Sequence, residues 1–465
     1  MNISSFAIFG LFGTRNVHIP ISKNRLILVG VNGIGKSTVL SMFYAYISLR
    51  WDRLREFQFD VIEIVLNDEL VRLSKEEIIR FRRFTRGIGQ YPALGTPRTN
   101  EDDLHDALEE MLKTGEVSPG ALAKYSLTPS ALRRLRDEVL HAAGDVPQLF
   151  SLQNYFNVRR SIKNGLNATV VYLPTYRRIE KELSTIVPKL EDAVRSYEDR
   201  SLRAVQEALF EPQRQPLSYI DLVQFGMADI THLISQTLAN INLSARIKLN
   251  ELSGIYLREI IRNEVTASSI NAALNYAEDE IRSILDRVSE GALEPRDKSL
   301  LIKAVEDAKG HKEINERTTY LLHYLGRVVE TVKSIEALED PIRRFVDVCN
   351  QNYFIDKSFV YDTEKYSLGI RRHGGEKVEL KDLSSGEKQV VSLFCHLYLG
   401  SPRSFVVLID EPELSLSVDW QVSFLPDIMN TDRCKFLFAV THSPFIHENE
   451  FDEHAVDLAG HMGLY

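Results

Sequence analysis

Cysteine is scarce in this sequence. Only Cys349, Cys395 and Cys434 occur among 465 residues, and their spacing matches neither a metal motif nor a disulfide framework. The sequence therefore predicts no disulfide-stabilised fold and no cysteine zinc site. A reducing, cytoplasmic environment fits this cysteine usage.

Long apolar runs are also missing. No segment approaches the roughly 18 consecutive apolar residues that a membrane-spanning helix needs. The partly apolar segment 1–13 lacks the basic flank of a signal peptide, and we interpret it with its neighbour as two strands, 6–12 and 17–21. No fixed-period repeat, low-complexity tract or long uninterrupted heptad series is present, which argues against an extended coiled-coil arm.

Positive charge is in deficit overall. The net charge is -9, which argues against a generally basic surface for nucleic acid but leaves room for a local basic groove. Hydrophobic residues make up 44% of the chain and charged residues 26%, as is usual for a globular protein. A length of 465 residues suffices for two or three structural units with a large core.

What the sequence does contain begins with the segment 30–37, GVNGIGKS, which follows the apolar run 26–29 and precedes a helix-compatible stretch. A strand, a glycine-rich turn and a helix in this order are the setting of a phosphate-binding loop. Its backbone N–H groups surround a phosphate at a helix N-terminus, where the helix dipole favours an anion. Lys36 is expected to reach the β- and γ-phosphates, and the Ser37 hydroxyl to bind Mg²⁺. The predicted ATP-binding residues of this segment are Asn32, Gly33, Gly35, Lys36, Ser37 and Thr38.

A second group of motifs lies about 350 residues later. The segment 383–389, LSSGEKQ, begins a helix-compatible run, and the apolar segment 405–409 then leads to Asp410, Glu411 and Pro412. A continuous apolar run of this length predicts a strand buried on both faces, whose carboxyl end lies at the ligand-binding edge of an α/β sheet. Asp410 is placed to hold Mg²⁺, and Glu411 to act as the base for an attacking water.

A further apolar strand is expected at 435–440, and it delivers Thr441 and His442 to the same edge. A histidine there can sense or polarise a γ-phosphate. We therefore predict that Glu411, His442 and Lys36 are catalytic, and that Ser37 and Asp410 bind the metal. Each late motif is weak alone, but their order makes a chance match improbable.

This ordered set resembles the ABC-type ATPase heads of the SMC and OLD-like families. The resemblance implies that the signature residues Ser384, Ser385, Gly386 and Glu387 contact the ATP held by an opposite protomer. It also implies a head-to-tail homodimer that encloses two ATP molecules, with 415–419 as the loop that crosses the dimer and His442 as the switch histidine. In these ATPases a glutamine at the junction of the two lobes senses the bound metal. Here the segment 169–178 contains none, and neither Gln148 nor Gln153 can be assigned to that role.

The expected fold class is α/β, an ABC-type P-loop ATPase head with a mixed sheet and flanking helices, split by a largely α-helical insertion. The N-terminal lobe is predicted at 1–66 and the C-terminal lobe, with signature, acidic strand and histidine, at 351–465. Between them we expect a mixed insertion at 67–168, a lobe-junction strand and loop at 169–178, and a helical insertion at 179–350. Breakers at Pro212, Pro216, Gly254 and Pro295 predict several packed helices and at most a short helical hairpin.

Basic clusters in the predicted insertions offer a DNA-binding interpretation, because phosphate contacts need several cations on one face. A solvated helix face explains each cluster alone better, and the clusters together make DNA contact about as probable as not. The candidate DNA-binding residues are Arg80, Arg82, Arg83, Arg133, Arg134, Arg177 and Arg178.

The OLD-like resemblance is the more specific one, through the segments 172–180 and 410–416. OLD-type nucleases carry a metal-dependent nuclease domain after the histidine motif, whereas residues 443–465 alone follow it here, and Ser417 stands where such ATPases often have a histidine. His442, His447 and His454 are expected at the surface and not in a metal cluster. An OLD-like ATPase without its own nuclease resembles the ATPase subunit of the Septu phage-defence system and of its retron-linked relatives.

That resemblance implies a dimer-based, ATP-hydrolysing scaffold, or a higher oligomer of dimers, that regulates a separate HNH nuclease acting on DNA. The cofactors it implies are ATP and Mg²⁺. Two alternatives stay open. One is a stand-alone SMC-like ATPase in DNA repair or recombination, and the other is a nucleotide switch that binds ATP without appreciable hydrolysis.

Overall fold

The computed structural model describes residues 1–89, 146–174, 219–221, 227–288, 293–310, 315–400 and 404–464. The chain forms two compact units. Unit 1 consists of Met1–Val223 and Arg403–Tyr465, and unit 2 of Gln224–Pro402. We treat each unit separately.

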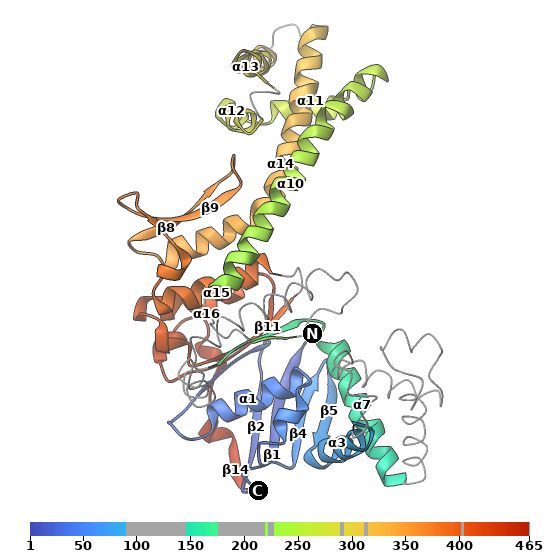
Figure 1. Ribbon diagram of the computed structural model, residues 1–465, viewed down its shortest axis with the longest axis vertical. Coiled ribbons are helices and arrows are strands. Elements are labelled where there is room, and N and C mark those ends of the chain that lie inside the picture. The colour runs from blue at the N-terminus through green and yellow to red at the C-terminus, as the bar shows by residue number, and fades with distance from the viewer. Residues whose placement is uncertain are drawn as a thin grey trace. The chain divides into compact units, whose positions relative to one another are not determined.

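A parallel sheet of six strands forms one layer of unit 1, in the order β13-β3-β12-β11-β6-β7 (Figure 1). Its strands are β3 (Arg25–Val29), β6 (Thr169–Leu173), β7 (Tyr219–Asp221), β11 (Phe405–Asp410), β12 (Cys434–Val440) and β13 (Ala455–Asp457). Every residue of β11 is buried, as expected for a strand covered on both faces. Because β3, β11 and β12 are parallel neighbours, the loops that follow them emerge at one edge of the sheet.

An antiparallel sheet of five strands forms the second layer, in the order β14-β2-β1-β4-β5. Its strands are β1 (Ile3–Leu11), β2 (Arg15–Pro20), β4 (Val61–Leu66), β5 (Glu69–Ser74) and β14 (Met462–Leu464). Burial alternates strictly along β4, so one face of this sheet points into the core. The pairing of β14 with β2 joins the two ends of the described chain in one sheet.

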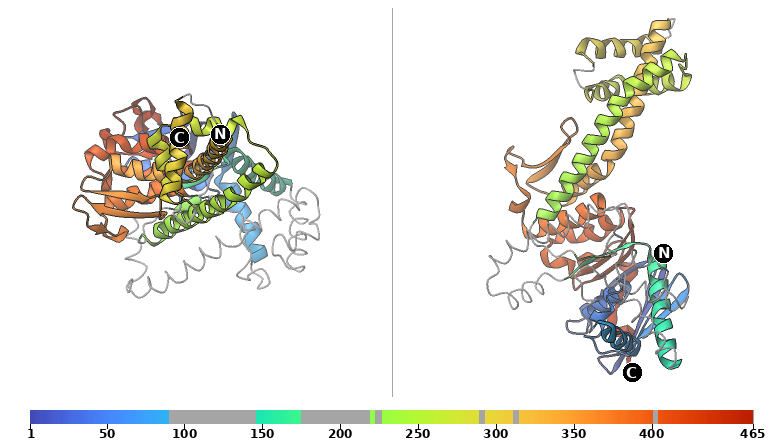
Figure 2. Two further views of the ribbon diagram at one scale, coloured as in Figure 1. Left: turned by 90° about the horizontal axis from the view of Figure 1, so that it is seen from above. Right: turned by 45° about the vertical axis from the view of Figure 1, so that its right-hand side comes forward.

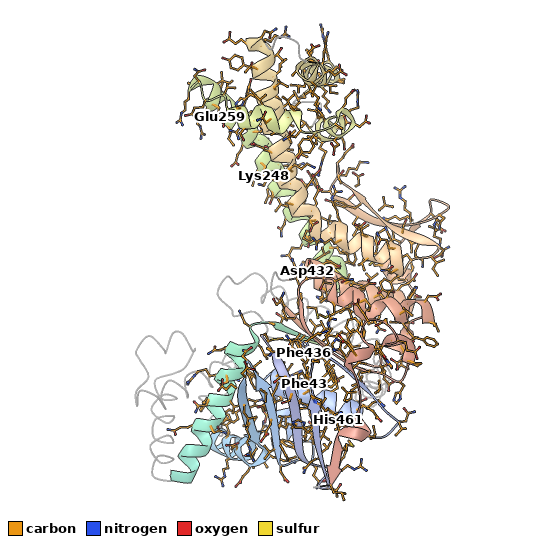
Figure 3. The ribbon with its side chains drawn as sticks, turned by 180° about the vertical axis from the view of Figure 1, so that it is seen from behind. Phe43, Lys248, Glu259, Asp432, Phe436 and His461 are labelled. Atoms are coloured by element: carbon orange, nitrogen blue, oxygen red, sulfur yellow. The ribbon has the colours of Figure 1, made fainter. Side chains whose placement is uncertain are left out.

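Helix α1 (Lys36–Ile47) contributes to the core between the two sheets and is buried on most of its surface. Its Phe43 ring lies 5.0 Å from Phe6 of the antiparallel sheet and 5.5 Å from Phe436 of the parallel sheet (Figure 3). Aromatic packing on both sides fixes the helix whose first residue is Lys36. The remaining helices of unit 1 are α2 (Trp51–Leu54), α3 (Lys75–Gly89), α7 (Val146–Leu166), α16 (Val418–Met429) and the 3-10 turns η2 (Pro412–Ser415), η3 (Pro444–Ile446), η4 (Asp452–His454) and η5 (Leu458–His461).

Unit 2 is built on two long helices, α10 (Ala228–Ile261) and α14 (Glu316–Asn352), which run side by side in opposite directions (Figure 2). Three short helices pack where α10 ends and α14 begins, around a separate apolar core. A three-stranded antiparallel sheet and the helix α15 lie where α10 begins and α14 ends. These elements are α11 (Ala267–Leu274), α12 (Glu278–Asp286), α13 (Pro295–Lys309), β8 (Lys357–Asp362), β9 (Ser367–Arg372), β10 (Lys377–Val378), η1 (Leu380–Asp382) and α15 (Ser385–Leu399).

The predicted fold class is confirmed. The chain is α/β, and the sequence of its sheet-containing unit is interrupted by a largely helical segment. The compact units divide at 223 and 403, not at the lobe boundaries expected from the sequence. The described part of 67–168 belongs to unit 1, and the signature helix belongs to unit 2. No helix in the described ranges is long and apolar enough to cross a membrane.

Two local expectations were wrong. Gly254 was expected to break the helical insertion, but it lies inside the 34-residue helix α10, because one glycine costs only about 1 kcal/mol relative to alanine in a helix. The helical hairpin was expected to be short at most, but its α10 arm has 34 residues and is about 50 Å long at 1.5 Å per residue. The helix-compatible stretch after the phosphate-binding loop forms two helices, α1 and α2, with Leu49 between them in the left-handed region at φ 61°.

Two helical glycines of unit 2 provide a matched stability test. A Cβ at Gly326 of α14 would lie 1.9 Å from the backbone oxygen of Ser269, whereas a Cβ at Gly254 of α10 would meet nothing within 4 Å. We expect Gly326→Ala to lower the free energy of unfolding by about 1–3 kcal/mol through overpacking. We expect Gly254→Ala to raise it by about 0.5–1 kcal/mol. Urea unfolding followed by circular dichroism measures both, and equal stability of the two variants would contradict the close contact of α11 with α14.

Candidate functional site

The phosphate-binding loop lies where the sequence predicts it, between β3 and α1. Gly30, Gly33 and Gly35 have φ values of 141°, 80° and 111°, which side chains with a Cβ rarely adopt. Space is tight at two of them: a Cβ at Gly30 would lie 3.0 Å from Asp457 Oδ1, and one at Gly35 3.2 Å from the Phe12 ring. The loop therefore needs these glycines to turn its backbone N–H groups toward one point, as an anion site at a helix N-terminus requires.

Lys36 is held by three acceptors, two in this loop and one on the turn that follows β12. Its ammonium donates to the carbonyl oxygens of Gly30 (2.8 Å) and Val31 (3.2 Å) and to Nε2 of His442 (2.7 Å). An ammonium has no lone pair, so Nε2 acts as the acceptor. Burial lowers the pKa of Lys36, while the nearby carboxylates of Glu411 and Asp410 oppose that shift. A phosphate in the loop would supply acceptors to the same ammonium.

Ser37 and Asp410 meet across the edge of the sheet. The Ser37 hydroxyl donates to Oδ1 of Asp410 at 2.9 Å, although 373 residues separate them in the chain. A hydroxyl and a carboxylate in contact are hard oxygen donors of the kind that Mg²⁺ prefers, so Ser37 and Asp410 are the residues that would hold this metal. No group of three or more His, Cys, Asp or Glu side chains suited to a metal occurs among the described residues.

Glu411 follows β11 in an unusual backbone conformation. Its φ of 51° and ψ of 63° place it in the left-handed region, and its N–H donates to the Val440 carbonyl at 2.8 Å. Burial raises the pKa of its carboxyl, and the charges of Asp410 and Glu413 add to that shift while His442 and Lys36 oppose it. A glutamate that is protonated more readily than usual is suited to take a proton from water.

His442 is positioned by a residue whose role we did not predict. Glu413 accepts hydrogen bonds from the His442 N–H (2.7 Å) and from the Thr441 hydroxyl (2.8 Å), so one carboxylate fixes the turn that follows β12. Nε2 of His442 lies 3.8 Å from Glu411 Oε1, within reach of the predicted base. Sequence reasoning could have found Glu413, because it stands in the acidic segment 410–413, but nothing in the sequence indicates its partners.

A test of Glu413 separates positioning from catalysis. We expect Glu413→Ala to lower kcat of ATP hydrolysis about 10–100-fold with a smaller change in KM, because the His442 turn loses its two anchors while the phosphate loop is unchanged. Glu450→Ala, at an exposed acid beyond this turn, serves as the control and should keep the wild-type rate. A wild-type kcat for Glu413→Ala would show that the turn is held without this carboxylate.

The signature residues lie in unit 2, at the start of α15. Ser384 is the N-cap of α15, and the side chains of Ser384 and Glu387 form a reciprocal capping box. Ser384 and Ser385 are exposed, whereas Gly386 and Glu387 are buried. Glu387 also pairs with Lys357 at 3.0 Å. The structure thus uses Glu387 to shape the helix start, and the contact of all four residues with ATP stays a prediction.

The candidate DNA-binding residues are only partly described. Arg80 forms an ion pair with Glu76, and Arg82 one with Asp52. Phe81 between them is buried and stacked on Tyr155, so it offers no exposed ring. The side chains of Arg83, Arg133, Arg134, Arg177 and Arg178 fall outside the described residues.

The histidines and glutamines give a mixed outcome. His454 was expected at the surface but is buried beside Phe451, and burial lowers its pKa. Gln153 is exposed on α7, which packs against α3 and β5, and the side chain of Gln148 falls outside the described residues. Gln421 is a buried glutamine that we did not anticipate. It accepts from the Ser443 hydroxyl and donates to the Leu416 carbonyl, so it braces the turn that follows β12.

Comparison with known protein families gives one match. The family model described as "AAA domain, putative AbiEii toxin, Type IV TA system" matches residues 214–448, just over half of the chain. This range includes the signature, the acidic strand and His442, and it lies after the phosphate-binding loop. No curated protein matches the chain.

Solved structures similar to the chain include two Smc head domains. One, from Pyrococcus furiosus, has an extended coiled coil and is bound to the C-terminal domain of ScpA. It shares 12% identity at a TM-score of 0.35, over 100% of this chain and 95% of its own. The other, from Pyrococcus yayanosii, has a coiled coil and joint. It shares 15% identity at a TM-score of 0.30, over 96% of this chain and 93% of its own. At TM-scores this low, the strand order described above remains the basis for the fold.

Proposed function

This chain belongs to the AAA-domain family that the model matching residues 214–448 represents, and from this membership we propose that it is the ATP-hydrolysing subunit of an antiphage defence complex. An ATPase domain of this family binds ATP. The proposal adds that hydrolysis depends on Mg²⁺, that two subunits enclose the nucleotides, and that the dimer regulates a separate HNH nuclease acting on DNA.

One observation carries the ATPase part of the proposal. Three segments of the chain, 30–38, 410–413 and 441–442, converge at one edge of the parallel sheet, and direct hydrogen bonds join Lys36 to His442 and Ser37 to Asp410. A cation, two oxygen groups that suit a metal, a candidate base and a histidine therefore lie together at this edge. Lys36 would hold phosphate charge, Ser37 and Asp410 would hold Mg²⁺, and Glu411 would take a proton from water.

Exposed apolar side chains next to this site support a dimer. Leu414, Val418, Val422 and Phe445 are each between 43% and 50% exposed. They lie on η2, α16 and η3, which pack against one another. Apolar groups grouped beside a nucleotide site are typical of a surface that another protein covers. The occupant we propose is a second copy, whose exposed Ser384 and Ser385 would donate to the nucleotide in trans.

Subunit mixing tests the shared site. Lys36→Ala removes the phosphate cation and Ser385→Arg obstructs the signature, so each variant alone should be inactive. If sites form in trans, a mixed dimer contains one intact site, and a random one-to-one mixture regains about a quarter of wild-type turnover, as the symmetry of a two-site dimer requires. Two differently tagged Lys36→Ala preparations are the control and should regain nothing. If tandem purification shows that heterodimers have formed and the mixture of the two variants is still inactive, the shared site is contradicted.

The nuclease part has its own experiment. Co-expression with the neighbouring genes, followed by purification through a tag on this chain, should recover an HNH-type nuclease in a defined ratio. A complex without any nuclease would remove this role and leave the ATPase role intact. The competing role, a stand-alone SMC-like ATPase in DNA repair or recombination, predicts instead that DNA stimulates ATP turnover of the isolated protein and that no nuclease co-purifies.

A further inference from the structure

Helix α10 has apolar side chains on two opposite faces. The buried residues of one face include Ile241, Ala245 and Leu252. The exposed residues of the other face are Leu243 (60% exposed), Ile247 (48%), Leu257 (58%) and Ile261 (75%). At about 100° per residue, the two sets are centred roughly 180° apart. Leu252 packs in the core that includes Leu322 and Leu325 of α14, so the exposed set points away from α14.

The exposed set has the spacing of a helix-pairing seam. With Asn250 and Gly254 between them, the residues 243, 247, 250, 254, 257 and 261 follow one another at steps of four, three, four, three and four. Alternating steps of four and three define the a and d positions at which two helices pack side by side. We call these six positions the outer seam. It runs for about 27 Å along α10 and therefore fits a helix of similar length.

Gly254 supports the same conclusion. It lies in the middle of α10, it is exposed, and a Cβ there would meet nothing within 4 Å. Packing among the residues that the structure describes therefore does not require glycine here, although glycine destabilises a helix interior relative to alanine. At a central seam position, a residue without a side chain lets the backbone of a second helix approach closely.

Charge beside the outer seam selects the occupant. Arg246 and Arg258 lie on the two flanks of the seam and take part in none of the ion pairs found among the described residues, and Glu251 is the exposed acid on one flank. Glu259 does not balance them, because it is engaged by Arg327 and His323 on the α14 side (Figure 3). A second copy of α10 would bring the same cations together, whereas acidic flanks on a partner would complement them.

We propose that the outer seam of α10 docks an amphipathic helix of a partner protein, with acidic residues beside its apolar seam. The apolar side chains provide the buried area, and the basic flanks select the sign of the partner's charge. This interaction does not depend on the nucleotide site of unit 1, and it holds whether or not the partner of the ATPase is a nuclease.

A designed pair of peptides tests the proposal on the full chain. Both are fluorescent 21-residue helices with leucine and isoleucine at a and d, and they carry either glutamate or lysine at e and g. We expect the glutamate peptide to bind at least about 10-fold more tightly in fluorescence anisotropy, and its affinity to fall with added salt. Leu257→Ser should weaken that binding at least about 10-fold, and the double variant Arg246→Glu, Arg258→Glu should reverse the preference.

Ile255→Ser is the matched control, because Ile255 is 40% exposed on the same helix but lies away from the seam. It should leave peptide binding unchanged, and all variants should keep the wild-type unfolding midpoint. Equal affinity for the two peptides, or a Leu257→Ser variant that binds like the wild type, would overturn the proposal. A dimer of the nucleotide-free protein, seen in light scattering, would also overturn the proposal if Leu257→Ser abolished it and Ile255→Ser preserved it. A second copy of the chain would then cover the outer seam.

Discussion

Replacing Glu411 by glutamine is expected to lower the kcat of ATP hydrolysis by about 10²–10⁴-fold while ATP stays bound. The amide keeps the size of the side chain but cannot take a proton from water. Lys36, Ser37 and Asp410 remain in place, so the phosphate and metal contacts are unaffected. Phosphate release measures turnover, and chromatography of the released nucleotide measures occupancy. Glu450→Gln is the control, at an exposed acid with no place in the site.

The same carboxylate predicts the pH dependence of kcat/KM, which reports groups of the free enzyme. Burial raises the pKa of Glu411 above its ordinary 4.5, so its base form is lost on acidification at a higher pH than for an ordinary glutamate. Burial lowers the pKa of Lys36 below its ordinary 10.5, so the ammonium is lost at a lower pH than for an ordinary lysine. The pH range over which kcat/KM is high should therefore be narrower at both its acid and its alkaline end. If kcat/KM of Glu411→Gln still falls at acid pH as in the wild type, another group is responsible for that fall. Identical turnover of variant and wild type would mean that hydrolysis is no part of the cycle.

Lys36→Ala is expected to weaken ATP binding by about 100-fold or more and to abolish measurable turnover. The change removes the cation that neutralises phosphate charge in a partly buried loop, where such electrostatic contacts are strong. It also leaves Glu411, Asp410 and Glu413 without their shared positive neighbour, so the site repels an anion. Isothermal titration with a non-hydrolysable ATP analogue measures the affinity, and the unfolding midpoint confirms the fold.

Lys435→Ala is the matched control for this change. Lys435 lies on β12, beside the strand that leads into the phosphate loop, but its side chain is exposed and bonds only to the Asp432 carbonyl. It should bind the analogue like the wild type. Unchanged affinity of Lys36→Ala would mean that the nucleotide is held elsewhere, and the site described here would lose its main support.

Some features of this protein could be predicted from its sequence, because the signals are local. Strand β6, Thr169–Leu173, begins where the predicted lobe-junction strand begins, and β11 covers the predicted apolar run 405–409 and ends one residue later, at Asp410. A buried parallel strand needs continuous apolar residues, and a phosphate loop needs glycines beside a lysine, so both leave a mark in a short window. The convergence of Lys36, Asp410, Glu411 and His442 follows from strand order in this class of sheet.

Other features were decided only by tertiary contacts. The role of Glu413 depends on the turn after β12 that brings Thr441 and the His442 N–H to its carboxylate, 28 and 29 residues away. Arg80 and Arg82 look in the sequence like parts of a basic surface, yet folding places acids beside both of them. Helix α10 continues through Gly254 because packing along the rest of the helix outweighs one unfavourable residue. The sequence by itself thus determined the elements and the chemistry at their ends. Hydrogen bonds, ion pairs and packed faces between distant segments were fixed only by the fold, because they depend on distances that no local pattern encodes.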